Sequence, residues 1–449
     1  MRNIANRVEK GRYLDSVALM RASRKLAAVP GVEEAALMMG TPSNRELMRA
    51  ANLLAKEGEA AGPNDLVIAV RGSAAQAALD AALGFLNETG EKGLESVRTL
   101  AAAKSTLPNA NLALVSVPGA YAAHEARKAL EAGLNVLVFS DNVPVEDEVE
   151  LKKLAARKGL LVMGPDCGTA LIGGTPIAFA NAVPRGDIGL VSASGTGLQE
   201  VSTLIARLGG GVSHGIGVGG RDLGERVGGL GTLAALELLE QDPQTKTIVL
   251  ISKPPAPAVA KKILEKVKKS SKPCVICFLG SAEGARTLTE AAEKAVGKAF
   301  EKGESTIARV SGSIKGLFCG GTLCSEAELI IGEDKGDFID LGDDEYTRGK
   351  PHPMIEPDLR TPHLRNALAD PKVGVILVDV VLGYGGHENP AAVLVSALEK
   401  NKKTIIASVT GTDMDPQNRA RQVEILRAAG VIVADSNARA AELARSAVT

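Results

Sequence analysis

The 449-residue sequence has few aromatic residues: they make up 2% of the chain, and tryptophan is absent. A surface that binds nucleic acid by stacking on bases is therefore not expected. The formal net charge of −1 offers no attraction to nucleic acid or to an anionic membrane surface. The sequence also lacks an apolar run long enough to span a bilayer, and its first residues have no signal-peptide pattern. These absences predict a cytoplasmic protein with no nucleic-acid or membrane partner.

Cysteine is scarce, with five residues at positions 167, 274, 277, 319 and 324. The odd number argues against a disulfide framework. Cys274 and Cys277 form a CxxC, but they lie in KPCVICFLG, which has the pattern of a buried strand. Residues i and i+3 of a strand face opposite sides of a sheet, so this pair is not expected to share a metal. The thiols are expected in the core, and no metal site is predicted.

Glycine, by contrast, is abundant, with 49 residues, many of them at the ends of strand-like runs. Residues 13–100 have the pattern of a small α/β unit, in which YLDSVALM (13–20) is expected as a strand. From about residue 110, apolar runs alternate with helix-like runs, which predicts doubly wound parallel sheets. The fold class is thus α/β, and the expected regions are 1–100, 101–184, 185–300 and 315–449, with a linker at 301–309.

The stretch VSASGTGLQEV (191–201) joins a strand-like run to an amphipathic, helix-like run. Such a turn directs free backbone N–H groups and the positive end of a helix dipole at one place, which suits an anion. An ordinary serine or threonine N-cap explains the same residues. Similar turns occur in GYGGHE (383–388), TGTDMD (410–415) and GPDCGT (164–169). Their number favours anion binding, because ligands of open parallel sheets bind at the carboxyl ends of the strands.

The anion itself is not identified by these turns. GxxxxGK[ST] is absent, and no GxGxxG follows the first strand, so neither a Walker-type nor a dinucleotide site is predicted. The candidate binding residues are Ser194, Gly195, Thr196, Gly219, Gly220, Arg221, Gly385, Gly386, Gly411 and Thr412.

Two histidines are candidates for catalysis. A neutral His387 in its glycine turn could donate to a phosphate or carbonyl oxygen, and the alternative is a solvent-facing turn residue. His214 is either catalytic or a satisfied polar group at a strand end. Arg221 offers a guanidinium fork that could hold a carboxylate. Asp343, Asp344 and Glu345 (343–345) form either a solvated acidic loop or a metal or partner site.

Longer stretches resemble known proteins. From about 110 to 290 the chain resembles the α subunit of succinyl-CoA synthetases, through VSVPGAYAAHEA, VPVEDEVELKKLA, MGPDCGTALIGGT, GDIGLVSASGTGLQEV and HGIGVGGRDL. From about 318 to 449 it resembles the carboxyl-terminal domain of the β subunit, through GGTLCSEAELI, FIDLGDDEYTRG, VGVILVDVVLGYGGHENPA and SVTGTDMD. This implies a CoA-binding-like Rossmann domain followed by two flavodoxin-like ligase domains. Together with the N-terminal unit, VEEAALMMGTPSN and KPHPMI, the order of motifs resembles the FdrA family over almost its full length.

In the synthetases, the N-termini of two helices face a histidine that carries phosphate. The resemblance places Ser194–Thr196 at one N-terminus and Gly385–His387 at the other. The chain departs from the synthetases in four ways. The histidine of their GHAGA motif is missing from SAEGARTLTEAAEKAV, and SKPPAP (252–257) replaces their acidic loop. AVRGSAAQ (69–76), the nearest counterpart of the CoA loop, lacks its lysine, and no ATP-grasp domain is present. A phosphohistidine relay is therefore not expected, no cofactor is predicted, and CoA binding is left open.

The FdrA resemblance implies one subunit of an oxamate carbamoyltransferase in allantoin breakdown, which converts oxalurate and phosphate to oxamate and carbamoyl phosphate. The alternatives are an acyl-CoA ligase, which the fold suggests, and a non-catalytic scaffold or regulatory subunit. The implied partners are phosphate or carbamoyl phosphate, oxamate or oxalurate, and other subunits in a homo- or hetero-oligomer.

Overall fold

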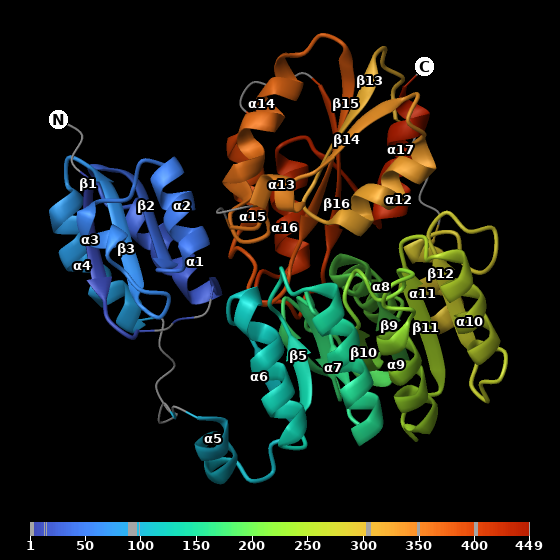
Figure 1. The fold of residues 1–449 in the computed structure, drawn as a ribbon. Coiled ribbons are helices and arrows are strands. Elements are labelled where there is room, and N and C mark those ends of the chain that lie inside the picture. The colour runs from blue at the N-terminus through green and yellow to red at the C-terminus, as the bar shows by residue number, and fades with distance from the viewer. Residues whose placement is uncertain are drawn as a thin grey trace. The chain divides into compact units, whose positions relative to one another are not determined.

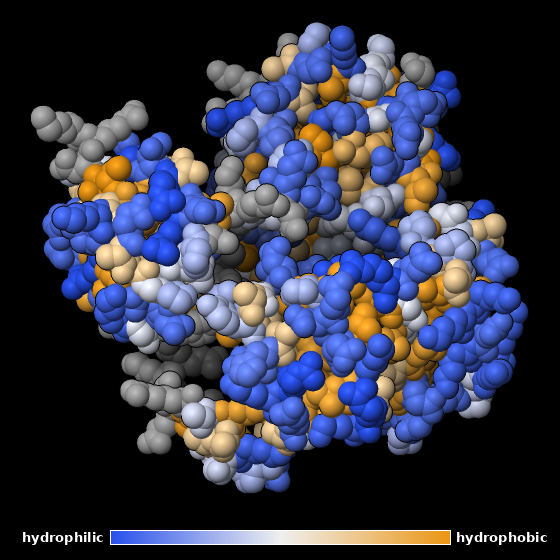
Figure 2. Space-filling model, in the orientation of Figure 1, coloured by the Kyte–Doolittle hydropathy of each residue, from blue (hydrophilic) through white to orange (hydrophobic). Residues whose placement is uncertain are grey.

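A computed structural model describes residues 4–12, 14, 16–88, 97, 99–301, 307–347, 351–398 and 403–448. The chain divides into two compact units, with the boundary between residues 108 and 109. Hydrophilic residues cover much of the surface that Figure 2 shows, although hydrophobic residues gather between some helices of the second unit. Within the described residues, no helix has both the length and the apolar character that crossing a membrane requires.

The first unit has a three-stranded sheet in the order β1-β3-β2, with both pairs of strands antiparallel. Its elements are β1 (Ile4–Glu9), α1 (Ser16–Ala27), β2 (Val32–Met39), α2 (Pro42–Ala50), α3 (Lys56–Glu59), β3 (Leu66–Gly72), α4 (Ala75–Glu88) and α5 (Leu100–Thr106). The expected strand at 13–20 is wrong from Ser16 onward, since these residues begin a helix. Leu19, Ala22 and Leu26 are buried at the i, i+3, i+7 spacing of a helix face.

The second unit begins with a parallel sheet in the order β4-β5-β6. Its elements are β4 (Leu112–Val115), α6 (Gly119–Glu131), β5 (Asn135–Val138), α7 (Val145–Lys158) and β6 (Val162–Met163). The strand that contains the start of AVRGSAAQ is β3, the central strand of the first unit, and it does not belong to this sheet. The match to a CoA loop at 69–76 therefore lacks the parallel sheet that such a loop would follow.

A six-stranded sheet follows in the order β12-β11-β9-β10-β7-β8. Its elements are β7 (Thr169–Ile172), β8 (Thr175–Ala178), β9 (Arg185–Ser192), α8 (Gly195–Arg207), β10 (Val212–Gly217), α9 (Leu230–Gln241), β11 (Thr247–Ser252), α10 (Pro257–Val267), β12 (Cys274–Phe278) and α11 (Leu288–Val296). Strands β9 to β12 are parallel, and the β7–β8 hairpin adds an antiparallel edge. Cys274 and Cys277 pack into different core clusters, as the alternation of a strand predicts.

The last sheet is fully parallel, with the order β14-β13-β15-β16-β17. Its elements are β13 (Ser313–Phe318), α12 (Gly321–Ile331), β14 (Gly336–Asp340), α13 (Asp344–Thr347), η1 (Pro357–Arg360), α14 (Thr361–Ala369), β15 (Val373–Val381), α15 (Pro390–Ser396), β16 (Thr404–Thr410), α16 (Arg419–Ala428), β17 (Ile432–Ala434) and α17 (Asn437–Ala447). The predicted α/β class with parallel sheets is confirmed.

The six-stranded and five-stranded sheets share one hydrophobic core. Helices α8 and α11 on the first of these sheets contact α12 and α17 on the second, and the shared cluster includes Leu198, Leu204, Leu323 and Leu443. Figure 1 shows the two sheets with α8 and α12 near the boundary between them. Because α8 follows β9 and α12 follows β13, the packing brings the carboxyl ends of two parallel sheets together.

Candidate functional site

Helix α8 begins directly after the buried strand β9. Ser194 is its N-cap residue: the backbone is extended, with φ −148° and ψ 126°, and Oγ accepts a hydrogen bond from Gly197 N. The hydroxyl of Ser192 also bonds to the backbone of Ser194, at 3.1 Å from N and 2.7 Å from O. These local bonds fix where the helix starts, so Ser194 is an N-cap, the role that the sequence offered as the alternative to anion binding.

Helix α12 begins in the same way after β13, but its N-cap residue is Gly320 and has no capping side chain. The carboxylate of Asp379 on β15 takes that place, since it accepts hydrogen bonds from Cys319 N and Gly320 N, both at 2.8 Å. A carboxylate here also interacts favourably with the positive end of the helix dipole.

The N-termini of α8 and α12 meet. The hydroxyl oxygens of Ser194 and Thr322 lie 2.6 Å apart, and a Cβ atom built on Gly320 would lie 3.1 Å from Thr196 Cβ. We call Ser194–Thr196 together with Gly320–Leu323 the helix junction. The structure therefore corrects the expected pairing, because the helix that faces Ser194–Thr196 is α12 and not the helix after Gly385–His387.

The helix junction presents several backbone donors. Within the described residues, the N–H groups of Gly195 and Thr196 on α8 and of Gly321, Thr322 and Leu323 on α12 donate to no protein acceptor. Such groups belong to the unpaired first turn of any helix, but here two first turns share one place. Gly195 is exposed to solvent and Thr196 and Gly321 are half-buried, whereas Thr322 and Leu323 are buried.

Three side chains that are not among the candidate residues border the helix junction, although one of them, Thr169, lies in the GPDCGT turn. A Cβ atom on Gly321 would lie 2.3 Å from Asp340 Oδ2 and 3.5 Å from Lys253 Nζ, and one on Gly195 would lie 3.2 Å from Thr169 Oγ1. Lys253 and Asp340 each stand at the carboxyl end of a parallel strand, β11 and β14. Their position at strand ends is the feature of the sequence that could have identified them, because ligands of open parallel sheets bind at the carboxyl ends of the strands.

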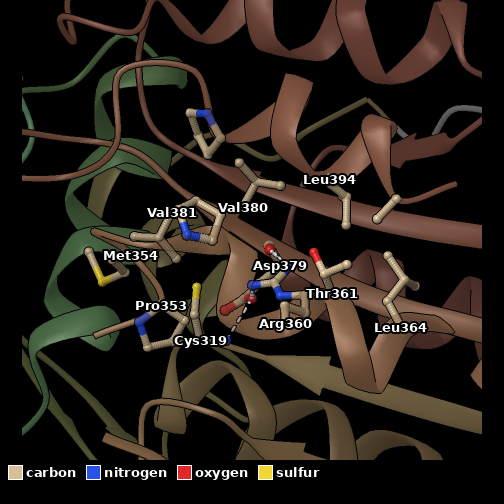
Figure 3. Close-up of a pocket in the computed structure, with 13 residues that line it drawn as sticks. Cys319, Pro353, Met354, Arg360, Thr361, Leu364, Asp379, Val380, Val381 and Leu394 are labelled. Carbon is tan, nitrogen blue, oxygen red and sulfur yellow. Dashed lines mark hydrogen bonds and ion pairs between the residues drawn. The ribbon is translucent and has the colours of Figure 1, made fainter. Parts of the chain in front are cut away.

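Behind α12, Asp379 and Arg360 form a buried ion pair that Figure 3 shows. One guanidinium nitrogen of Arg360 lies 2.9 Å from Asp379 Oδ1, and another donates to Asp379 O at 2.6 Å. Arg360 Nε has no hydrogen-bond partner within the described residues. In the adjoining cavity, the centre of a water molecule can move within about 20 Å³. The cavity is large enough for a bound water that accepts from Nε and too small for a substrate.

Gly385–His387 form a turn that bonds to its own surroundings. His387 N donates to Met354 O at 2.8 Å, and His387 Nδ1 accepts from Asn389 N at 2.9 Å. Asn389, not Gly386, is the N-cap of the seven-residue helix α15. The histidine thus stabilises the loop before the helix.

The TGTDMD turn packs against a loop of the neighbouring sheet. Thr412 Oγ1 donates to Ala182 O at 2.6 Å, and Thr412 N donates to Asp415 Oδ2 at 2.8 Å. Gly411 packs closely on Leu382. Since both polar atoms of Thr412 are in protein hydrogen bonds, this turn joins the two sheets rather than offering free donors.

The GGRDL loop lies beside the helix junction but is tied to α7. A Cβ atom on Gly220 would be 4.0 Å from Ala193 O, and one on Gly219, whose φ is +89°, would be 2.5 Å from Pro165 O. Arg221 donates to Val143 O at 2.9 Å and pairs with Glu148 Oε2 at 3.0 Å. The arginine therefore contacts protein groups, and its side chain remains partly exposed.

His214 lies away from the other candidates. Its Nδ1 accepts from Gly173 N at 3.2 Å, and its Nε2 is 3.8 Å from Asp242 Oδ2. Asp242 precedes β11 in the chain, so this contact is on the amino side of the parallel strands. Burial lowers the pKa of His214, against the raising effect of Asp242. The structure does not bring His214 to the helix junction, and it has the contacts of a satisfied polar residue.

Three family comparisons match parts of the chain. The CoA-ligase family matches residues 317–447, the CoA binding domain matches 185–280, and the domain described as "AllF, heavy metal-associated domain" matches 1–101. The CoA binding match falls on the six-stranded sheet, whereas the sequence interpretation placed the CoA-binding-like domain at 101–184. The first 101 residues contain no cysteine. Within the described residues, no group of three or more metal-ligating side chains exists, so the residues do not fit a heavy metal.

Among known proteins, the chain is 43% identical to "Uncharacterized protein YahF" of Escherichia coli, over 98% of this chain and 97% of that one. It is 31% identical to succinate–CoA ligase subunit alpha 2 of Archaeoglobus fulgidus, over 32% of this chain and 50% of that subunit. A solved dinucleotide-forming acetyl-coenzyme A synthetase of Ca. Korarchaeum cryptofilum has a TM-score of 0.35 and 17% identity, with 80% of this chain and 85% of that one covered.

Proposed function

The chain belongs to the family of the Escherichia coli protein YahF and carries CoA-ligase and CoA binding domains, and from this premise we propose that it is an FdrA-type subunit of an oxamate carbamoyltransferase. In this proposal, the helix junction holds the phosphate of carbamoyl phosphate. The observation that carries the proposal is the meeting of two helix N-termini at Ser194 and Thr322. The match of the first unit to the AllF domain supports a place in allantoin breakdown.

The helix junction has the chemistry of a phosphate site. Each helix N-terminus contributes about 0.3–2 kcal/mol toward an anion, and backbone N–H groups that donate to phosphate oxygens form charge-assisted hydrogen bonds. The ammonium of Lys253 adds a full positive charge beside Gly321. The same donors would stabilise negative charge that develops as the carbamoyl group is transferred.

The histidine content favours carbamoyl phosphate over a phosphohistidine intermediate. The sequence contains no histidine between His214 and His352, so the loop after β12 cannot carry a phosphohistidine to the helix junction. The Nε2 of His352 borders Gly342, and its Nδ1 accepts from Met354 N at 3.2 Å. A phosphate that arrives or leaves as carbamoyl phosphate needs no such residue.

An acyl-CoA ligase is the second candidate, because two of the matching domains take their names from CoA. The segment nearest to the synthetase CoA loop, AVRGSAAQ (69–76), begins in β3 of the first unit and lies outside the parallel sheets. The chain also spans only half the length of the succinate–CoA ligase subunit that it matches. We therefore assign no CoA site and no step to CoA.

Oxalurate phosphorolysis tests the proposal. The purified chain is assayed for carbamoyl phosphate release, first alone and then with the products of neighbouring genes. Activity is expected only in the mixture, because the alignment of the two reactants by a partner subunit affects the rate by orders of magnitude. Formation of an acyl-CoA from ATP, CoA and succinate by the same mixture, without carbamoyl phosphate release, would favour the ligase.

A matched pair of lysine variants locates the phosphate. Lys253→Met is expected to weaken the binding of inorganic phosphate, measured by calorimetry, by roughly tenfold or more, the cost of one hydrogen bond to a charged group. Lys261→Met removes an exposed lysine from α10 and is expected to leave the affinity unchanged. Equal affinities in all three proteins would remove Lys253 from the site.

A further inference from the structure

Asp340 ends strand β14, and its carboxylate lies against the first turn of α12. Oδ1 accepts a hydrogen bond from Gly342 N at 2.9 Å. Oδ2 is on the side of Gly321, where a Cβ atom would lie only 2.3 Å from it. Within the described residues, no hydrogen bond to Oδ2 is present. The carboxylate therefore has one oxygen fixed by the backbone and the other directed at the helix junction.

The charges around Asp340 come from several elements. Burial raises its pKa, the Gly342 N–H and the Lys253 ammonium lower it, and the carboxylates of Asp379 and Asp343 raise it again, with a net upward shift. The His352 ring also borders Gly342, and burial lowers the pKa of His352 to about 4, so this ring is neutral at pH 7. A half-buried aspartate whose pKa is raised and whose Oδ2 faces the helix junction can accept a proton and return it.

We propose that Asp340 is a catalytic residue that carries the proton in the carbamoyl transfer, an inference that rests on the proposed function. An oxygen of hydrogenphosphate attacks the carbamoyl carbon of oxalurate, and its proton moves to Asp340 Oδ2. The bond between that carbon and the oxamate nitrogen then breaks, and Asp340 returns the proton to this nitrogen. The products are carbamoyl phosphate and oxamate, and no other reactant is consumed.

Other acidic and basic groups near the helix junction already have other contacts or another role. Both carboxylate oxygens of Asp379 accept backbone hydrogen bonds, and Oδ1 also pairs with Arg360. Nδ1 of His352 accepts from Met354 N, so its proton is on Nε2 and the ring is not placed to accept one from phosphate. Lys253 serves to hold the anion. Asp340 is the carboxylate that the geometry leaves for proton transfer.

The test compares Asp340→Asn with Asp337→Asn in the mixture that releases carbamoyl phosphate from oxalurate. Asp337→Asn changes an exposed carboxylate on the same strand and is expected to keep the wild-type rate. Asp340→Asn is expected to lower the rate by roughly 10²–10⁴-fold, the usual contribution of a general base. Its affinity for inorganic phosphate should be unchanged or higher, because a negative charge beside the anion is removed.

The pH profile gives a second readout. The wild-type rate should fall below the pKa of Asp340 as the base becomes protonated, and the Asp340→Asn variant should lack this acidic limb. A variant that binds phosphate and keeps the wild-type rate and profile would overturn the role of Asp340 and leave the proposed function standing. A wild-type mixture that neither binds phosphate nor releases carbamoyl phosphate would overturn the proposed function and this inference with it.

Discussion

The hydroxyl oxygens of Ser194 and Thr322 lie 2.6 Å apart, although 128 positions separate the two residues in the chain. Ser194 caps a helix of the six-stranded sheet, and Thr322 is in the first turn of a helix of the five-stranded sheet. Together with the packing of α8 against α12 in their shared core, this contact holds the two helix N-termini close together.

Gly321→Ala should weaken phosphate binding. A methyl group at this position would meet Asp340 Oδ2 at 2.3 Å, so either the carboxylate or the first turn of α12 has to move. Alanine is favourable in a helix, which keeps the change local. We expect phosphate affinity, measured by calorimetry, to fall by roughly tenfold or more, equivalent to about 1.4 kcal/mol.

Gly386→Ala is the matched control, because a Cβ atom there has no neighbour closer than 3.4 Å. The affinity should then equal that of the wild type. The opposite result, with binding lost in Gly386→Ala and kept in Gly321→Ala, would return the anion site to the turn that contains His387.

Much of the fold was predictable from local patterns. The buried runs GVILVDV, TIIASVT and VIVAD follow the spacing of strands in a parallel sheet, and each is a strand in the structure. The N-cap at Ser194 was also visible, since a serine between a strand and an amphipathic run is a local signal. The strand expected at 13–20 failed because a short apolar run does not distinguish a strand from the start of a helix.

The partner of α8 was not predictable in this way. The resemblance to the synthetases placed Gly385–His387 opposite Ser194–Thr196, whereas Gly320 has no capping side chain of its own that would mark the start of α12. The carboxylate that completes the α12 N-terminus comes from Asp379, 59 residues later in the chain. A contact at that distance follows from the packing of the sheet, and no local motif contains it.

Asp379→Asn should destabilise the second unit. The substitution leaves the buried Arg360 guanidinium without its carboxylate and removes an acceptor from the turn before α12. Loss of one partner of a buried ion pair costs about 3–5 kcal/mol, so the urea midpoint followed by circular dichroism should fall clearly. Asp337→Asn, which changes an exposed carboxylate paired with Lys315, should shift it little. Equal midpoints in the two variants would contradict a supporting role for Asp379.

Lys152→Met should be far more damaging than Lys153→Met. Lys152 is 4% exposed, and its ammonium bonds to Glu148 Oε1 and Asp222 Oδ1, both at 2.7 Å. Without it, two buried carboxylates face each other, and the free energy of unfolding should fall by roughly 3–5 kcal/mol. Lys153 is exposed and lies 3.6 Å from Glu150, a surface pair worth about 0–1 kcal/mol. Thermal unfolding of both variants measures the difference, and similar melting temperatures would show that the buried network is dispensable.

Glu326 should make the stability of the second unit depend on pH. It is 1% exposed, and its carboxylate accepts from Leu288 N at 2.7 Å and from Asn437 Nδ2 at 2.8 Å. Burial, with a smaller contribution from the Glu200 carboxylate, raises its pKa from 4.5 to about 7. Between pH 4.5 and pH 7 the folded protein keeps the proton on Glu326, whereas the unfolded chain has lost it. The stability that this proton confers is therefore complete below pH 4.5 and is lost as the pH rises through 7.

Glu326→Gln should remove this dependence, because the amide is neutral at every pH and its oxygen can still accept from Leu288 N. The amide nitrogen cannot accept from Asn437 Nδ2, which costs the variant the same amount at every pH. The urea midpoint of the wild type should therefore fall relative to that of the variant as the pH rises from 5 to 8. The difference between the two proteins isolates Glu326 from every other group that titrates in this range. Glu333→Gln, an exposed change just beyond α12, should follow the wild-type curve throughout. If the Glu326→Gln curve also ran parallel to it from pH 5 to pH 8, the proton would not reside on Glu326.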